Sequence, residues 1–436
     1  MKKYYLLTIL SLFIVLPVLA QTSDSVSLIS VVSRALDYYP KLKEQKTQLE
    51  VADYKTDIIK SKFRPTVEAD AVYRHIYPTS YAQLGGGERL AFFPLDQWDM
   101  GLKVSQTIYD FGKTNAEFEK TKSEKKLSED QFMNTSFNFA YQVANVYNNI
   151  IFLNKSIDAI DAQINVLTTT LKVIDSRIRN GVGIEFDLVS TQVKLNDAIN
   201  RKTELLNNLK KQSILLNALS GSNLEPTVQK LKTFEYSMKT FNADSVFAVA
   251  QHGNTELLAA KSKQAVAANE VKVNSKNWAP SLVFNGGVGY KNGYFPGNIY
   301  NLEFNYVVGA GLSIPIYTGG RNDNQHKISK VNLQASQYYL DEVSINLKKD
   351  IEQNIADVNT FQQKVVFSAT QMEQARRALD LANSRFKNGV ITNIELLDAQ
   401  SNVLKSSVDK IFYEYQVATT QLELKRLMGV RFWAQN

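Results

Sequence analysis

The chain has 436 residues, no cysteine and a formal net charge of +7. The absence of cysteine excludes disulfides, thiol catalysis, thiolate metal sites and a lipid anchor on an N-terminal cysteine. Removal of Lys2 and Lys3 with an N-terminal leader would lower the charge to +5 (7 − 2). So mild an excess gives no reason to expect nucleic acid as a partner.

Residues 1–20 have the pattern of a secretory signal peptide. Two lysines give a positive start, residues 6–19 are apolar, and Val18-Leu19-Ala20 fits a small-residue cleavage site. The alternative is a retained anchor, which is disfavoured because the apolar run is shorter than the ~20 residues of a membrane-spanning helix. No later apolar run approaches that length, so we expect any membrane insertion to occur through strands.

Residues 21–221 are expected to form the first of two structural repeats. It opens with two short helices and two strands: 27–38, 40–62, about 66–77 and about 97–109. Apolar and polar residues alternate along both strands, which is typical of an outer-membrane barrel. A soluble sheet would need a second layer over the apolar face, and nothing nearby in the sequence supplies one. Residues 78–94 are expected to form a long loop.

A long helical hairpin follows at 113–220. Its first helix, 113–180, contains neither Gly nor Pro and would be ~100 Å long. Its apolar residues follow the 3-4 spacing of a coiled-coil seam at Ile150, Leu153, Ile157, Ile160, Ile164, Leu167, Leu171, Ile174 and Ile178. The second helix, 184–220, is half as long, so the sequence predicts that the 40–62 helix covers the rest of the first one.

The second repeat has the same order of elements. A linker at 222–244 precedes it, and residues 245–429 are expected to contain strands at about 281–291 and 305–317 and a helical hairpin at 321–428, before a short tail at 430–436. The copies are offset by 208 residues in the hairpins but by 215 before the strands, so the second strand pair should have a loop 7 residues shorter (215 − 208). Residues 177–192 and 385–400 are identical at 6 of 16 positions.

This architecture implies assembly of several chains. Four strands cannot close a barrel, because about eight is the practical minimum, and an open sheet would leave unpaired edges in lipid. Three chains would supply twelve strands, and their helices would continue as a tube about 100 Å long.

The chain resembles the TolC-type outer-membrane efflux proteins over essentially all of its mature length. The resemblance is carried by the duplicated hairpin, the helix ends Arg177-Ile178-Arg179-Asn180-Gly181 and Arg385-Phe386-Lys387-Asn388-Gly389, the strand exits Tyr109-Asp110-Phe111-Gly112-Lys113 and Tyr317-Thr318-Gly319-Gly320-Arg321, and Ile394-Glu395-Leu396-Leu397-Asp398-Ala399. Two features depart from the family. The tail is short, and Ile391 stands where some members have an arginine that helps to tie the closed tip.

The resemblance implies a mainly α fold with membrane β structure: an α-helical tunnel in the periplasm and a twelve-stranded barrel formed by a homotrimer in the outer membrane of a Gram-negative bacterium. It implies a channel that exports small molecules or proteins as the outer component of a tripartite efflux or type I secretion system. Its expected partners are a periplasmic adaptor (a membrane fusion protein), an inner-membrane transporter of the RND or ABC type, and outer-membrane lipid.

Three acidic residues are the candidates for the tunnel constriction: Asp187, Glu395 and Asp398. The first two each lie six residues after the glycine of a hairpin tip, at the start of a helix. The helix dipole alone favours an acidic residue there. Asp398 lies one turn beyond Glu395 on the same face. The resemblance implies that residues at the positions of Glu395 and Asp398 line the constriction.

Two further sets of residues are singled out. The expected adaptor-docking tips are Asn180, Gly181, Val182, Gly183, Asn388, Gly389 and Val390. The aromatic residues at the strand–helix junctions are Phe63, Tyr109, Trp278 and Tyr317, for which a membrane-interface belt and ordinary junction packing remain alternatives.

The sequence gives no support for an enzyme. His75, His252 and His326 lie in unrelated segments without metal-ligand spacing, so we expect no catalytic residue, cofactor or metal. The alternative to an export duct is an adhesive trimeric coiled coil on the cell surface. That alternative predicts strands at one end of the chain and a single long helix, which the duplicated and interleaved order disfavours.

Overall fold

The computed structural model describes residues 27–83, 85–87, 89–222, 233–293 and 298–434. The predicted signal peptide, most of the first half of the linker and the last two residues lie outside these ranges. Among the described residues, no helix combines the length and the apolar character needed to cross a bilayer.

The elements follow the order expected from the repeat. The helices of the first repeat are α1 (Leu28–Tyr38), α2 (Pro40–Ser61), α3 (Lys113–Arg179) and α4 (Glu185–Ser220). Those of the second are α5 (Ala243–Gly253), α6 (Thr255–Ser275), the 3₁₀ helix η1 (Lys276–Trp278), α7 (Arg321–Lys387) and α8 (Asn393–Leu427). The strands are β1 (Thr66–His75), β2 (Tyr81–Gln83), β3 (Arg89–Ala91), β4 (Asp96–Tyr109), β5 (Ser281–Lys291) and β6 (Glu303–Ser313).

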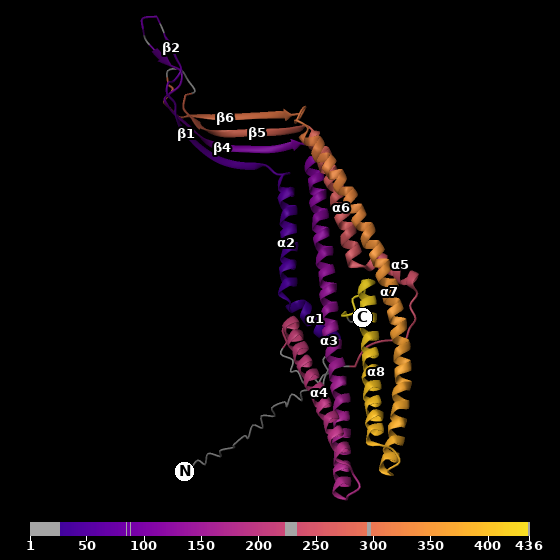
Figure 1. Cartoon of the computed structure of the whole chain (residues 1–436). Helices are drawn as coiled ribbons and strands as arrows, with labels where there is room; N and C mark the ends of the chain where they lie inside the picture. Colours follow the sequence, from indigo (N-terminus) through magenta and orange to yellow (C-terminus); the bar gives the residue numbers. More distant parts are fainter. Residues whose placement is uncertain (1–26, 84, 88, 223–232, 294–297, 435–436) are drawn as a thin grey trace, which may run out of the picture.

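The helices form one long layer below the sheet (Figure 1). Near the sheet the helices pack in the order α2, α3, α6, α7, and towards the tips in the order α4, α3, α8, α7. The short helices α2 and α4 therefore lie end to end along α3, as the difference in helix length predicts. The fold expected from the sequence, long duplicated helical hairpins with four membrane strands per chain, is confirmed.

The coiled-coil seam explains why α3 and α7 stay helical over 67 residues each. None of the nine predicted seam positions is exposed in α3, and none of their counterparts 208 residues later is exposed in α7. The largest apolar core lies halfway along α3, where α1, α4 and α8 surround Val143, Tyr147 and Ile150. Burial of these side chains, at about 1.5–3 kcal/mol for each large apolar residue, holds the two repeats together.

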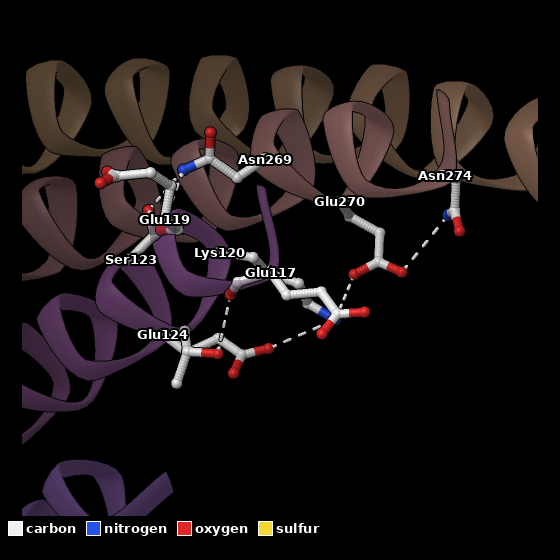
Figure 2. A network of polar contacts seen from close by, with 9 residues as sticks. Glu117, Glu119, Lys120, Ser123, Glu124, Asn269, Glu270 and Asn274 are labelled. Carbon is white, nitrogen blue, oxygen red and sulfur yellow. Dashed lines mark hydrogen bonds and ion pairs between the residues drawn. The ribbon is translucent and has the colours of Figure 1, made fainter. Parts of the chain in front are cut away.

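Near the sheet the helices are held by polar contacts instead (Figure 2). Lys120 on α3 forms ion pairs with Glu270 on α6 and with Glu124. Asn269 of α6 donates a hydrogen bond to the Ser123 hydroxyl at 2.5 Å. Over its first 23 residues, all of them described, α3 buries only threonine side chains. The upper part of the tunnel wall is therefore a polar interface, which the seam pattern does not reveal.

The main sheet has the strand order β1-β4-β5-β6, with every neighbouring pair antiparallel. The register places apolar side chains on one face, including Val67, Leu102, Val288 and Val308, all of them exposed in the single chain. The opposite face carries Asp70, Lys103, Asp99 and Lys291 among glycines. One apolar and one polar face is the arrangement of a barrel wall between lipid and water.

Two expected strand ends and one expected loop differ in the structure. The first strand ends at His75 rather than about 77, and the last ends at Ser313 rather than about 317. Pro78 and Pro315 lie just beyond these ends, and a proline cannot donate a ladder hydrogen bond. The expected loop at 78–94 contains the small hairpin β2–β3, whose strands are too short to give an alternating pattern.

Candidate functional site

The two hairpin tips share the backbone turn that ends α3 and α7. Asn180 and Asn388 end the helices α3 and α7, and the glycines that follow have φ of +77° and +71°. Val182 N–H donates to the carbonyl of Arg177 at 3.0 Å, and Val390 N–H to that of Arg385 at 2.9 Å. Glycine is required because other residues adopt positive φ only with strain. The expected tips therefore lie together at the end of the molecule farthest from the sheet (Figure 1).

Arg177 ties the two tips to each other. Its Nη2 donates to the carbonyl oxygens of Phe386 and Lys387, at 2.6 and 3.2 Å. Its guanidinium also lies over the Phe386 ring, 4.3 Å from the ring centre. The last carbonyls of a helix lack intrahelical partners and carry the negative end of its dipole, so a cation is favoured there.

Two buried amides in the first turns of α8 join this helix to α3 and α4 of the first hairpin. Asn393 Nδ2 donates to the Thr191 hydroxyl at 2.9 Å and to the carbonyl of Asp187 at 3.2 Å. Gln400 Nε2 donates to the Thr170 hydroxyl at 3.0 Å. Both amides are almost fully buried, so loss of either bond would leave an unsatisfied polar group. Sequence analysis missed them because the partners lie more than 200 residues apart.

Glu395 has a defined local role. Its Oε2 accepts hydrogen bonds from the Thr392 N–H and hydroxyl, both at 2.8 Å, and its own N–H donates to Thr392 Oγ1. This is a capping box at the start of α8. The bonds from the backbone and side chain of Thr392 lower the pKa of the Glu395 carboxyl. The helix-start interpretation of Glu395 therefore has direct structural support.

The other two acidic candidates have fewer contacts. Asp398 is exposed, and its carboxylate accepts a bond from Asn402 Nδ2 at 3.2 Å. Asp187 is half-buried in the first turn of α4, and Asn393 binds its carbonyl rather than its side chain. The fold thus brings the starts of α4 and α8 together, with all three carboxylates near the tips.

Aromatic residues lie at both ends of the apolar face of the sheet. At the helical end, Phe63, Tyr109 and Tyr317 are exposed, while Trp278 is half-buried. At the far end, Tyr73 contacts Trp98 with ring centres 4.7 Å apart, and Tyr290 contacts Phe304 at 5.8 Å. Outer-membrane barrels carry aromatic girdles on both sides of their apolar band, so a membrane-interface role of the junction aromatics stays a prediction beside ordinary junction packing. Sequence analysis did not single out the aromatics at the far end, because they lie inside the alternating strands.

The histidines do not converge. His75 hydrogen-bonds Asp96 at 2.8 Å at the far end of the sheet, whereas His252 and His326 lie on α5 and α7. Within the ranges that the structure describes, no three His, Asp or Glu side chains form a group able to hold a metal ion.

Comparison with known proteins places this architecture in context. The chain matches the family of outer membrane efflux proteins over residues 31–222 and 247–430. It is 22% identical to the outer membrane protein TolC of Vibrio cholerae over 77% of both chains. It is 22% identical to the alkaline protease secretion protein AprF of Pseudomonas aeruginosa, covering 75% of this chain and 69% of that one. The crystal structure of the outer membrane protein VceC from Vibrio cholerae has the same fold, with a TM-score of 0.77 and 17% identity over 93% of this chain and 96% of that one.

Proposed function

Because the chain belongs to the outer membrane efflux protein family, we propose that three copies form the outer duct of a tripartite export machine. The protein is an outer-membrane channel for efflux or secretion. The proposal adds the homotrimer, the adaptor and the inner-membrane transporter of the RND or ABC type. The observation that carries it is that each edge of the single chain exposes a strand and helices that lack a neighbour on one side.

Each edge has an open strand and at least one helix, so one edge can pair with the other. At one edge lie β1, α2 and α4, and at the other lie β6 and α7. A strand at a sheet edge presents unpaired backbone groups, which cannot remain unpaired in lipid. A head-to-tail contact of β6 with the next copy's β1 would pair them, and such contacts close into a ring when the rotation fits. Three chains of four strands supply a barrel of twelve.

Apolar stripes on the edge helices support the same closure. On α2, Val51, Tyr54 and Ile58 follow 3-4 spacing and are 42%, 68% and 62% exposed. On α7, Val331, Tyr338 and Ile345 follow a seven-residue spacing and are at least 63% exposed. These are coiled-coil seams without a partner in the single chain. The neighbouring copy supplies that partner in the proposed trimer.

The adaptor is proposed to dock at the tips, which are the breaks in the helical wall farthest from the sheet. Val182 and Val390 project there and are 77% and 68% exposed. An adhesive coiled coil would need one uninterrupted helix, whereas this chain has a strand pair before each of its two hairpins.

Photo-crosslinking in cells tests this function. A photoreactive residue at Val182 or Val390 should capture the adaptor, and copurification should then identify the inner-membrane transporter. Tyr300, which is 73% exposed beyond the far end of the sheet, is the matched control and should capture neither. Equal capture from Tyr300, or no periplasmic partner from either tip, would reject the proposed docking.

A further inference from the structure

We propose that Arg385 ties neighbouring copies together at the tip by donating to the carbonyl oxygens of Ile178 and Arg179 in the next copy. The inference rests on the proposed trimer. The proposed contact between copies is the counterpart of the contact that Arg177 makes within the chain. The expected acceptors follow from the repeat offset, because 386 − 208 is 178 and 387 − 208 is 179.

The ends of α3 and α7 are similar enough in backbone structure to accept the same kind of contact. Gly181 N–H donates to the carbonyl of Ile178 at 3.0 Å, and Gly389 N–H to that of Phe386 at 3.0 Å. The residues that end the helices, Asn180 and Asn388, have φ and ψ within 3° of each other. The carbonyl of Phe386 accepts backbone bonds from Asn388 and Gly389 and a side-chain bond from Arg177. The carbonyl of Ile178 accepts the same backbone bonds, from Asn180 and Gly181, and no side chain of the described residues donates to it.

The order of the helices repeats across the boundary. Towards the tips the chain presents α4, α3, α8 and α7 in sequence. The internal repeat relates α4 to α8 and α3 to α7. Beyond α7, the next copy therefore places first its α4 and then its α3. Inside the chain, α3 is followed in the same way by α8 and then α7. Arg385 on α7 then faces the end of the next copy's α3 as Arg177 on α3 faces the end of α7.

The guanidinium of Arg385 is available for this contact. Its side chain is exposed and is not hydrogen-bonded within the described part of the chain, although, after the hydrogen bonds from Thr392, its charge also lowers the pKa of the nearby Glu395 carboxyl. Arg177, by contrast, is half-buried and bonded to two carbonyls. In the proposed trimer the guanidinium of Arg385 would bind two helix-terminal carbonyls, as the guanidinium of Arg177 does within the chain.

The other ties of the tip do not repeat at the boundary. The counterpart of Asn393 is Glu185, and that of its acceptor Thr191 is Ala399. Gln400 corresponds to Gln192, but its acceptor Thr170 corresponds to Ala378. A carboxylate cannot donate a hydrogen bond, and an alanine side chain cannot accept one. Of the three polar contacts described at the tip, only that of the arginine is preserved at the boundary, so Arg385 limits separation of the copies there.

Crosslinking distinguishes the two arginines because the chain has no cysteine of its own. In the Arg385→Cys, Arg179→Cys variant, a flexible bis-maleimide should join different chains and give dimers and trimers on a denaturing gel. In the control variant Arg177→Cys, Lys387→Cys it should join residues of one chain and leave a monomer. A monomer from the first variant, with the control crosslinked, would overturn the inference. The native mass before crosslinking reports separately whether the trimer exists.

Channel recordings test the consequence for gating. Arg385→Gln should raise the open probability of the reconstituted channel about tenfold, equivalent to ~1.4 kcal/mol, as expected for a bond to a charged group. Arg376→Gln, at an exposed arginine on the same helix, makes the same charge change and should leave gating unaltered. Gating of Arg385→Gln equal to that of the wild type, or an equal effect of Arg376→Gln, would reject the role of Arg385.

Discussion

Single residues at the tips combine local structure with a proposed role in the channel. Glu395 caps its own helix in the isolated chain, yet it is also a candidate for the constriction. These roles have opposite effects on its pKa. The bonds from Thr392 lower it, whereas like charges brought together on a threefold axis would raise it. Its neighbour Asp398 makes no such cap, and its exposed carboxylate accepts a bond from Asn402.

Charge-removing variants test the constriction. Glu395→Gln with Asp398→Asn keeps an acceptor for the cap but removes six charges from a trimer. We expect loss of most cation selectivity and of block by trivalent metal ions, because a ring of carboxylates attracts both. Reversal potentials and blocking titrations on reconstituted channels measure this effect. Asp380→Asn, an exposed acid higher on α7, is the control. Wild-type selectivity in the double variant would leave both residues as helix-start residues only.

The capping box should make the start of α8 sensitive to acid. Because the pKa of Glu395 is lowered, its stabilisation is present above the ordinary carboxyl pKa and is lost as the pH falls through the lowered value. Amide exchange of residues 393–396, corrected for intrinsic rates, should therefore rise at low pH. The start of α4 has no side-chain cap and serves as an internal control. Equal acid sensitivity at both sites would contradict this account.

Helices and strands with a strong hydrophobic period were predictable from the sequence, whereas the individual polar contacts between them were not. The 3-4 spacing in α3 and the alternation in β4 each report burial on one face, so sequence alone suggested their type and approximate bounds. The polar attachment of α3 to α6 has no such period. The ties from Asn393 and Gln400 depend on which distant helix lies beside them, which a single sequence does not encode visibly.

Adjacent residues of β6 test which face meets lipid. Val308 lies on the apolar face and Val307 on the polar face, and both are more than 60% exposed in the chain. Val308→Arg should cost about 2–4 kcal/mol if it lies near the midplane, whereas Val307→Arg should cost little. Denaturant unfolding in lipid vesicles gives both values. A larger cost for Val307→Arg would reverse the assigned faces.

Paired glycines allow close approach of the strands from the two repeats. A Cβ on Gly289 would collide with the carbonyl oxygen of Met100, and one on its partner Gly101 would lie 2.6 Å from that of Val288. Gly289→Ala should therefore reduce the yield of assembled protein. Gly287→Ala is the matched control, because it lies on the same strand and face and a Cβ there would make only ordinary contact, 3.5 Å from the Leu102 carbonyl oxygen. Heat-modifiability on gels reports assembly. Equal yields from the two variants would show that the close approach is dispensable.

At the scale of the whole molecule, one chain is a segment of a wall rather than a closed body. Its sheet has two open edges, and its helical layer has apolar stripes on α2 and α7. The internal repeat makes the chain approximately twofold in sequence and structure, so three copies would give six similar hairpins around one axis. The central claim is that this ring is the exporting unit.

Native mass spectrometry of protein extracted gently from the outer membrane tests that claim most directly. We predict one species containing three chains, each somewhat below the 49.2 kDa of the full sequence after loss of the leader. The Val308→Arg variant should yield less of it, and Val307→Arg should yield the normal amount. A chain recovered as a monomer, or found in the soluble fraction without detergent, would contradict the account.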